Sequence, residues 1–591
     1  MRLGKKFTRG VLPTLLCLVA MLIAACGGGG GSSAPTTGTT GTSKAPANQQ
    51  IYVFPEDTVS DIATFDPGLS TDLPSIQAID LVFTGLVQLD DNMKVQPQLA
   101  QSYQQMPDGL TWKFTLRPNL KFSDGTPLTS ADVAYSIDHA LQPAEKSTVS
   151  PIYLALVKDS DKLLAGKIKT IIGDSLLTPD PNTIEIVTNK KAAYFLDALT
   201  YSCSYVVEKS LIEKYGNLKF TDHLTEGGGD GPFKVAEYTH GLRIVFVPNP
   251  NYYGPIPQLK KVIYPFYKDL ATVYKAYQDN QLDSTGALSI PSTQFAAAKQ
   301  LTSEFHQVPQ LYINYYTMNY LIKPFDNIKI RQAFELAINK DVIVHSVWHD
   351  SVIASNHIVP SGMPGYSPNL TEPDGVKGTA GAPAMAKTLF QQGLQEEGMT
   401  LATLPPIRLT IESGNKDLGN EATALQQVWQ TVLGVHVTVD TIDFNKLLAE
   451  TQAALNNPKG LQFWGIAWIA DYPDPQDWTT LQFDKGVPNN QLNYGQNNSS
   501  DAAQQQAVQK QLEAADVMPP GDARLQAYMT AEQQLVNDVA WLPMEQVTVN
   551  LLRKPCVAGA VDNPQGIAPP NDWAAVSITT ATPCADTSSF Q

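Results

Sequence analysis

Three consecutive segments decide the fold class: "IRLTIES" (407–413), "ATALQQVWQTVLG" (422–434) and "VHVTVDTI" (435–442). The first and third alternate apolar and polar residues, which predicts two half-buried strands. The middle segment has apolar residues at helical spacing and stops at Gly434, as helices often do. A strand, a helix and a second strand form a crossover unit of a parallel or mixed sheet, so the predicted class is α/β.

The segment "LTWKFTLRPNLKFSDGTPLTSADVAYSIDHAL" (110–141) also combines strand and helix patterns. Alternation through Trp112 and Phe114 predicts a strand, and Asp124-Gly125 predicts a turn. Thr129 followed by Asp132 is the pattern of a helix cap in which the two side chains bond reciprocally to the backbone. We therefore expect a strand, a turn and a helix here.

Later segments add helices and a final strand. "FDNIKIRQAFELAINKD" (325–341) places Ile330 and Phe334 on one helical face, and Asp326 is the expected cap. Leu525, Met529 and Val536 mark another amphipathic helix, and "WLPMEQVTVNLLRKP" (541–555) then returns as a strand.

Length and charge limit the possible functions. The chain has 591 residues, 43% of them hydrophobic, so it buries a large core that we expect to be divided among several domains. Its formal net charge is −16. Such a surface repels phosphate backbones, which excludes nucleic-acid binding.

The N-terminus predicts an exported, anchored protein. Residues 1–25 combine a basic start with an apolar run too short to span a membrane, as in a signal peptide. The sequence before Cys26 resembles a bacterial lipobox, in which the cysteine is acylated and holds the mature chain at the cell membrane. Residues 26–50 are rich in Gly, Ser and Thr and are expected to be a flexible tether. The predicted location is therefore extracytoplasmic, in a bacterium.

Three cysteines remain in the folded part. Cys556 and Cys584 are close enough in sequence to pair in an oxidising compartment and to hold the C-terminal tail. Cys203 has no basic neighbour in "YSCSY", so we expect a buried apolar residue rather than a reactive thiol.

Nine segments occur in the order seen in solute-binding proteins of the peptide and nickel class, the extracellular receptors of ABC importers. They are "FDPGLSTD", "FTGLVQLD", "PQLAQSY", "DGLTWKFTLRPNLKFSDGTPLTSADVAYS", "GDGPFKVAEY", "PNPNYYGPIPQLKKV", "PFDNIKIRQAFELAINKD", "PSGMPGY" and "WIADYPDPQDW". The resemblance covers nearly all of residues 50–560. This chain departs from the usual pattern at Asp230, where Thr is usual, and at Ala467, where Gly is common.

The resemblance implies a two-lobed periplasmic-binding-protein clamp of type II, with mixed β-sheets flanked by helices and an additional inserted domain. It implies a binding protein without cofactor or catalysis, a monomer that delivers peptides to the transmembrane permease subunits of an ABC transporter. The expected division of the chain is lobe I at 50–83, 206–311 and 541–591, the inserted domain at 84–205, and lobe II at 312–540.

The segment "AWIADYPDPQDW" (467–478) holds three carboxylates. Pro475 suits the first position of a helix, which makes Asp474 the expected cap. Asp477 falls three residues later, where a carboxylate can reach back to the capping residue. Asp471 has no such local role after the apolar strand "FWGIAWIA" (463–470), and a carboxylate there needs a cation, from the chain's own Lys or Arg or from a ligand.

In the family that the chain resembles, the aspartate at the place of Asp471 binds the α-ammonium of a bound peptide. Ala467 and Ile469 match positions whose main chain pairs with the peptide, and Asp72 and Leu73 match the positions opposite. Trp468 would form the wall of a side-chain pocket or pack in the core.

Other functions find less support. His345 and His349 have a zinc-compatible spacing, but no third ligand is evident, and no motif for nucleophilic catalysis occurs. The alternatives left open are a receptor of the same fold for a nickel complex or an oligosaccharide, a secreted hydrolase and a passive adhesin. A hydrolase of glycans would need two free carboxylates, and only Asp471 is left.

Overall fold

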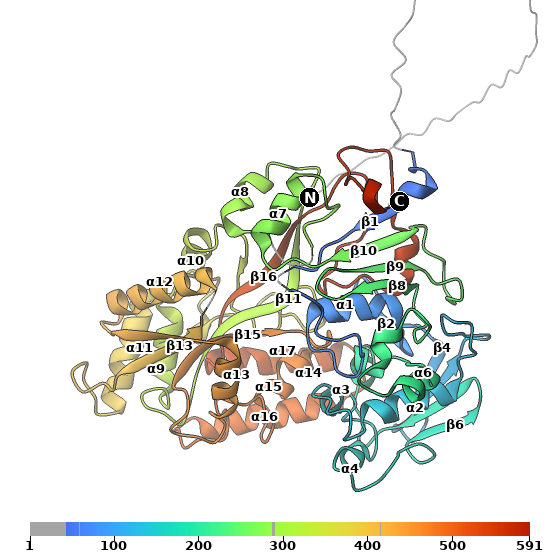
Figure 1. The fold of residues 1–591 in the computed structure, drawn as a ribbon. Coiled ribbons are helices and arrows are strands. Elements are labelled where there is room, and N and C mark those ends of the chain that lie inside the picture. The colour runs from blue at the N-terminus through green and yellow to red at the C-terminus, as the bar shows by residue number, and fades with distance from the viewer. Residues whose placement is uncertain (1–42, 58, 287–289, 414, 591) are drawn as a thin grey trace, which may run out of the picture. The chain divides into compact units, whose positions relative to one another are not determined.

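The computed structural model describes residues 43–590, except 58, 287–289 and 414 (Figure 1). The predicted signal peptide, the lipid-attachment residue Cys26 and most of the predicted tether lie outside the described residues. The described chain is a mixed α/β structure with two four-stranded sheets and one six-stranded sheet. Among the described helices, none is long and apolar enough to cross a membrane.

The first sheet is mixed. Its strands follow the order β1 (Ile51–Val53), β10 (Lys261–Pro265), β9 (Arg243–Pro248) and β8 (Phe233–Thr239), and only the pair β1 and β10 is parallel. Because side chains alternate along a strand, Tyr52 joins one hydrophobic core and Ile51 and Val53 join another. Helix α1 (Leu73–Val82) contributes to the core that contains Tyr52. Helix α7 (Leu270–Gln278) contributes to the core that contains Ile51 and Val53.

The tether is shorter than predicted at its C-terminal end. Residues 43–50 were expected to be flexible, but Ala45 and Gln50 are buried. The Gln50 side-chain amide donates to the carbonyls of Ala45 and Ile578, both at 2.8 Å. These backbone carbonyls satisfy the amide, so the segment is docked on the C-terminal strand rather than free.

The second sheet is antiparallel. Its strands follow the order β4 (Ala100–Gln105), β5 (Thr111–Leu116), β7 (Thr183–Val187) and β6 (Leu176–Asp180). Helix α2 (Ser130–Ala140) starts with the predicted reciprocal cap, in which Asp132 and Thr129 bond to each other's backbone. One hydrophobic core draws nearly all its residues from the range 86–206.

The third sheet has six strands and contains the predicted crossover unit. Its order is β12 (Ile353–Ala354), β16 (Leu542–Leu552), β11 (Phe305–Met318), β15 (Phe463–Ile469), β13 (Ile407–Glu412) and β14 (Val437–Ile442). Helix α12 (Lys416–Val432) connects β13 to β14, which are parallel, and Gly434 follows the helix at φ +75°. The α/β prediction for this stretch is confirmed.

Strands β11 and β16 pair antiparallel and connect two cores. Phe305 and Leu552 lie at one end of the pair, in or against the core of α7, whereas Met318 and Met544 belong to the core of α12. Any movement between these cores must bend this pair of strands.

Helix α9 (Ile328–Leu336) is capped by Asn327 and not by the predicted Asp326. The Asn327 Oδ1 accepts from the backbone N–H of Lys329 at 3.0 Å and of Ile330 at 3.3 Å. Asp326 instead lies 3.1 Å from the Lys323 ammonium. Both residue types cap well, so the helix start was misplaced by one residue.

The remaining helices and strands complete the fold. The helices are α3 (Ser150–Tyr153), α4 (Ser160–Leu164), α5 (Phe195–Ala198), α6 (Lys209–Tyr215), α8 (Phe295–Ala298), α10 (Lys340–Ser346), α11 (Pro383–Glu396), α13 (Phe444–Gln452), α14 (Pro475–Trp478), α15 (Thr480–Phe483), α16 (Ala502–Asp516) and α17 (Asp522–Asn537). The remaining strands are β2 (Val87–Leu89), β3 (Val95–Pro97), β17 (Val557–Ala558) and β18 (Ser577–Ile578). Cys556 and Cys584 form a disulfide with their Cα atoms 5.5 Å apart, and Cys203 is a buried free cysteine.

Candidate ligand-binding site

Strand β15 has an open edge next to the predicted ligand residues (Figure 1). On one side it pairs with β11 along its whole length, with Ile469 opposite Tyr312. On the other side its pairing with β13 ends at Trp464, and the described strands leave 465–469 unpaired there. The Ala470 N–H donates to the Leu311 carbonyl, so by the alternation of antiparallel ladders the backbone groups of Ala467 and Ile469 point to the open edge.

A cleft of about 850 Å³ lies along this edge. Ala467 and Ile469 line it, together with the aromatic side chains of Tyr312, Tyr316 and Trp348. Such a volume lies in the range of ligand pockets in proteins. The other predicted ligand residues, Asp471, Trp468, Asp72 and Leu73, do not line this cleft.

Asp474 has the predicted structural role and a second one. Its side chain caps α14 by accepting from the Gln476 N–H at 3.0 Å. Both its oxygens also accept from the buried guanidinium of Arg524, at 2.6 and 2.8 Å. A bidentate pair of this kind balances the charge of the carboxylate within the protein.

Asp477 does not reach back to the capping residue as predicted. Its Oδ2 accepts instead from the Asp471 N–H at 3.1 Å and from the Trp468 indole N–H at 3.2 Å. The Asp474 N–H donates to the Tyr472 carbonyl, so it has no need of this carboxylate. Asp477 is fully buried, and burial and the Asp471 charge raise its pKa. Asp477 thus fixes the backbone that presents Asp471.

Asp471 is a half-buried carboxylate without a basic partner. Among the described residues no Lys, Arg or His nitrogen forms an ion pair with it. The Tyr153 hydroxyl hydrogen-bonds to it, yet burial raises the pKa of Asp471 to about 6. The sequence left open whether an internal base or a ligand balances this charge, and no internal base does so here.

Tyrosines from the region of the second sheet surround Asp471. The Tyr153 and Tyr201 rings stack at 3.7 Å, and Tyr153 meets the Tyr472 ring edge-on at 6.4 Å. The Asp471 charge helps to raise the pKa of both Tyr153 and Tyr201, second to burial itself. Aromatic faces and one carboxylate together favour a cation, through the ring quadrupole and through charge.

The residues predicted on the opposite side lie at the start of α1. Asp72 caps this helix by accepting from the Ser75 N–H at 3.0 Å, and its Oδ2 is buried without a hydrogen-bond partner. Leu73 is the first helical residue and is half-buried. The Tyr201 hydroxyl donates to the Ser70 carbonyl at 3.0 Å, which connects the tyrosine cluster to this loop.

Trp468 is half-buried and packs against the core that contains Ile313 and Trp478. Its indole N–H is used by Asp477, as described above. A part of its ring remains accessible, so its role as the wall of a side-chain pocket stays a prediction.

The cleft carries acids that the sequence did not single out. The buried Glu421 accepts from the Tyr316 hydroxyl at 2.8 Å and from the Trp348 indole at 2.7 Å, and Glu545 hydrogen-bonds to it. Burial raises the pKa of both glutamates. Glu412 also lines the cleft, and burial raises its pKa as well. Lys416 is the one Lys or Arg of the lining.

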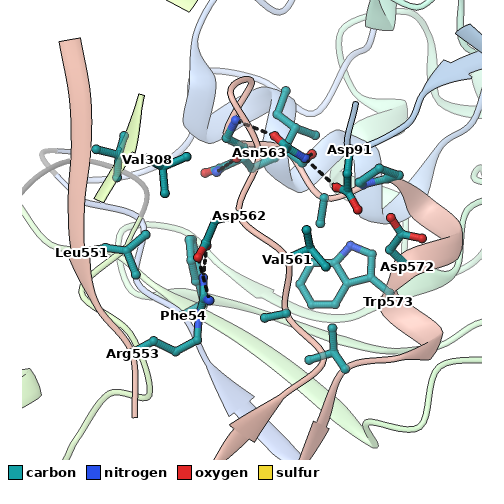
Figure 2. Close-up of a pocket in the computed structure, with 18 of the residues that line it drawn as sticks. Phe54, Asp91, Val308, Leu551, Arg553, Val561, Asp562, Asn563, Asp572 and Trp573 are labelled. Atoms are coloured by element: carbon teal, nitrogen blue, oxygen red, sulfur yellow. Dashed lines mark hydrogen bonds and ion pairs between the residues drawn. The ribbon is translucent and has the colours of Figure 1, made fainter. Parts of the chain in front are cut away.

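Figure 2 shows a second, smaller cavity of about 100 Å³ against the C-terminal segment that the disulfide holds. Phe54 and Trp573 line it, and Arg553 and Asp562 form an ion pair at its wall. It shares no lining residue with the cleft. Its size suits a few water molecules or a small solute, so the cleft is the better candidate for an extended ligand.

Sequence reasoning missed Tyr153, Tyr201 and Glu421. Tyrosine occurs 23 times in the chain, so no single one stands out, and Tyr153 is more than 300 residues from Asp471. Glu421 lies in the amphipathic helix α12 with the spacing of an ordinary core position. None of these three residues is marked by a local sequence pattern.

Comparison with known proteins gives one consistent result. The family model of bacterial extracellular solute-binding proteins, family 5, matches residues 94–490. The oligopeptide-binding protein OppA of Bacillus subtilis is 26% identical over 435 residues, which cover 72% of this chain and 76% of that protein.

Two solved structures share the fold. The unliganded open form of the periplasmic murein tripeptide-binding protein MppA superposes with a TM-score of 0.72 at 23% identity, covering 92% of this chain and 99% of the other. OppA of Haemophilus influenzae in complex with the peptide RPPGFSPFR has a TM-score of 0.68 at 21% identity, covering 90% and 99%. The described chain therefore has the two-lobed type II clamp fold that the sequence predicted. The chain belongs to family 5 of the bacterial extracellular solute-binding proteins, whose members bind solutes and are not enzymes.

Proposed function

We propose that this chain is the lipid-anchored, extracytoplasmic substrate-binding component of an ABC importer. It captures peptides in the cleft beside β15 and delivers them to the transmembrane permease subunits. The relatives named above are peptide-binding proteins, which supports a peptide as the ligand.

One observation carries the peptide assignment: no base of the described residues pairs with the Asp471 carboxylate, which lies among tyrosines two residues after the open edge of β15. A peptide supplies a cation for the carboxylate and a backbone partner for the open strand edge. Its α-ammonium pairs with Asp471, and its backbone pairs with the free groups of Ala467 and Ile469, as in strand addition. Backbone pairing is indifferent to side chains, so the cleft accepts many sequences.

The predicted roles of the remaining residues belong to this proposal. Asp72 and Leu73 present backbone to the ligand from the start of α1, and Trp468 contacts one of its side chains. The division into lobe I, inserted domain and lobe II is supported by the hydrophobic core drawn almost wholly from residues 86–206.

The N-terminus completes the proposal. Residues 1–25 direct export and are removed, Cys26 receives the lipid, and the Gly- and Ser-rich residues up to 42 connect it to the folded part. The protein acts as a monomer at the outer face of the cell membrane.

Binding of trialanine, measured by isothermal titration calorimetry, tests the function. Native mass spectrometry of the unrefolded protein identifies any ligand that it already holds. N-acetyl-trialanine is the matched control, because acetylation removes the ammonium and keeps the backbone. We expect the acetylated peptide to bind more weakly by about 1.5 to 3 kcal/mol.

Equal binding of the two peptides would show that Asp471 does not bind the ammonium. Retention of a sugar or a nickel complex, with no peptide binding, would favour a receptor for a non-peptide solute. Turnover of the peptide would indicate a hydrolase.

A further inference from the structure

Three ionisable side chains converge away from the cleft, where the loop before α1 meets the end of α2. Asp66 lies in this loop, His139 lies in the last turn of α2, and Glu145 lies in the turn that follows. Their exposed fractions are 5%, 8% and 6%. One ligand atom from each lies within 4.8 Å of the other two.

Each side chain is held in place by a contact outside the cluster. The Gly68 N–H donates to Asp66 Oδ1 at 2.9 Å, and Asn217 donates to Glu145 Oε1. The His139 ring stacks on Tyr135 at 5.5 Å. These contacts leave Asp66 Oδ2, His139 Nε2 and Glu145 Oε2 available to a ligand, and His139 Nε2 faces Glu145 Oε2 at 3.5 Å. Outer contacts of this kind are typical of metal ligands.

Two of these inward atoms lack a hydrogen-bond partner. Asp66 Oδ2 and His139 Nε2 are buried and unpartnered, and Glu145 Oε2 lies 3.5 Å from His139 Nε2. Buried polar atoms are nearly always satisfied, so two orphans in one cluster indicate a missing partner.

The charge of the cluster is also unbalanced. Among the described residues no Lys or Arg forms an ion pair with Asp66 or Glu145.

We propose that Asp66, His139 and Glu145 bind one divalent transition-metal ion of the zinc class. Neighbouring ligands about 2.1 Å from a tetrahedral ion lie about 3.4 Å apart, which matches the distance between His139 and Glu145. The Asp66 ligand atom lies within 4.8 Å of the other two and needs to approach by up to about 1.4 Å, and water supplies the fourth position. An imidazole ligand favours zinc, nickel or cobalt over magnesium and calcium, which prefer oxygen ligands.

The ion would fasten the loop of residues 66–72 to α2. The Ser147 hydroxyl, just after Glu145, already donates to the Gly68 carbonyl at the same place. This loop ends at Asp72, the cap of α1, so the metal holds the start of that helix. The proposal does not depend on the ligand of the cleft.

Zinc binding to the chelator-treated full chain tests the proposal, by calorimetry and by metal content after dialysis. We expect one zinc ion per chain, retained in excess magnesium or calcium. His139→Asn and Asp66→Asn should each weaken zinc binding by at least about 100-fold. Cobalt offers a second readout, because the tetrahedral ion with nitrogen and oxygen ligands absorbs visible light.

His345→Asn is the matched control, because His345 is exposed on α10, faces Asp350 and is four residues from His349. It should leave zinc binding unchanged. Loss of zinc in His345→Asn with retention in His139→Asn would place the metal at the surface pair and overturn the proposal. Absence of zinc binding by the parent chain would also overturn the proposal. If His139→Asn does not fold, Asp66→Asn and the cobalt spectrum decide.

Discussion

Two of the regions that bury carboxylates differ in the source of the positive charge. Around α9 and α10 the chain supplies it: Arg331 lies 2.6 Å from Asp501, and Lys340 lies 2.6 Å from Glu335. At the end of β15 no base within the described part of the chain pairs with Asp471, although Asp474, three residues later, has Arg524. The difference separates scaffold from site, because an internal ion pair is complete without a ligand and Asp471 is not.

The strongest test of the scaffold region is Lys340→Met. The fully buried Lys340 ammonium also donates to Asn356 at 2.8 Å and lies 3.6 Å from Glu372. Its loss leaves two acids buried together, so we expect the free energy of unfolding to fall by about 3 to 5 kcal/mol. Urea denaturation measures this.

Lys329→Met is the control for that variant, since the Lys329 pair with Glu396 is partly exposed. This variant should lower the free energy of unfolding by less than about 1 kcal/mol. If the two variants lower the free energy of unfolding equally, the buried ion pair is no more important for stability than the exposed one.

Asp471→Asn tests the site region. The substitution removes a half-buried charge that no described base balances and keeps an oxygen that accepts from the Tyr153 hydroxyl, so the free energy of unfolding should not fall. Peptide affinity should fall by about 1.5 to 3 kcal/mol, because the charge-assisted bond to the ammonium is lost. Calorimetry and urea denaturation on the same samples separate the two effects. A loss of stability with unchanged affinity would place Asp471 in the scaffold.

The pH dependence sharpens the contrast. The pKa of Asp471 without ligand is raised to about 6, so this residue favours the folded state less as pH rises from about 4 to 6. An ammonium binds the ionised form, so peptide affinity should rise with pH through about 6 and then level off. Asp471→Asn should remove this step from the affinity profile. If the variant shows the same rise of affinity with pH, another acid is responsible for it.

The smallest expected effect is that of Tyr153→Phe. The Tyr153 hydroxyl stabilises the ionised carboxylate of Asp471 and lowers its pKa. Without it the midpoint of the affinity profile should move to higher pH, and affinity at pH 7 should fall by about 0.5 to 1.5 kcal/mol. Tyr312→Phe, in the cleft but outside the tyrosine cluster, should leave the midpoint in place.

Local signals predicted the elements well. The crossover of residues 407–442, the reciprocal cap of α2 and the cap at Asp474 all depend on side chains within a few residues of one another. The cap of α9 was wrong by one residue, because Asp326 and Asn327 are adjacent and both suit the position.

The surroundings of Asp471 could not be predicted in the same way. That the acid lacks a base depends on where every Lys and Arg of the chain lies, which no local pattern states. Asp477 was expected to bond to the capping residue at the helix start. Its carboxylate accepts instead from the Asp471 N–H and the Trp468 indole N–H. Tyr153 and Tyr201 come from the end of α3 and from a later loop, and only the tertiary fold brings them to Asp471.

The open edge of β15 has a cost outside ligand binding. An unpaired edge can add a strand from any chain, including a second copy of the same protein, and Ile469 at its end is 59% exposed. The edge is only five residues long, and Pro473 and Pro475 follow it closely, which limits how far a foreign strand could extend. An occupied cleft would cover this edge, so the empty form is the one more prone to self-association at high concentration.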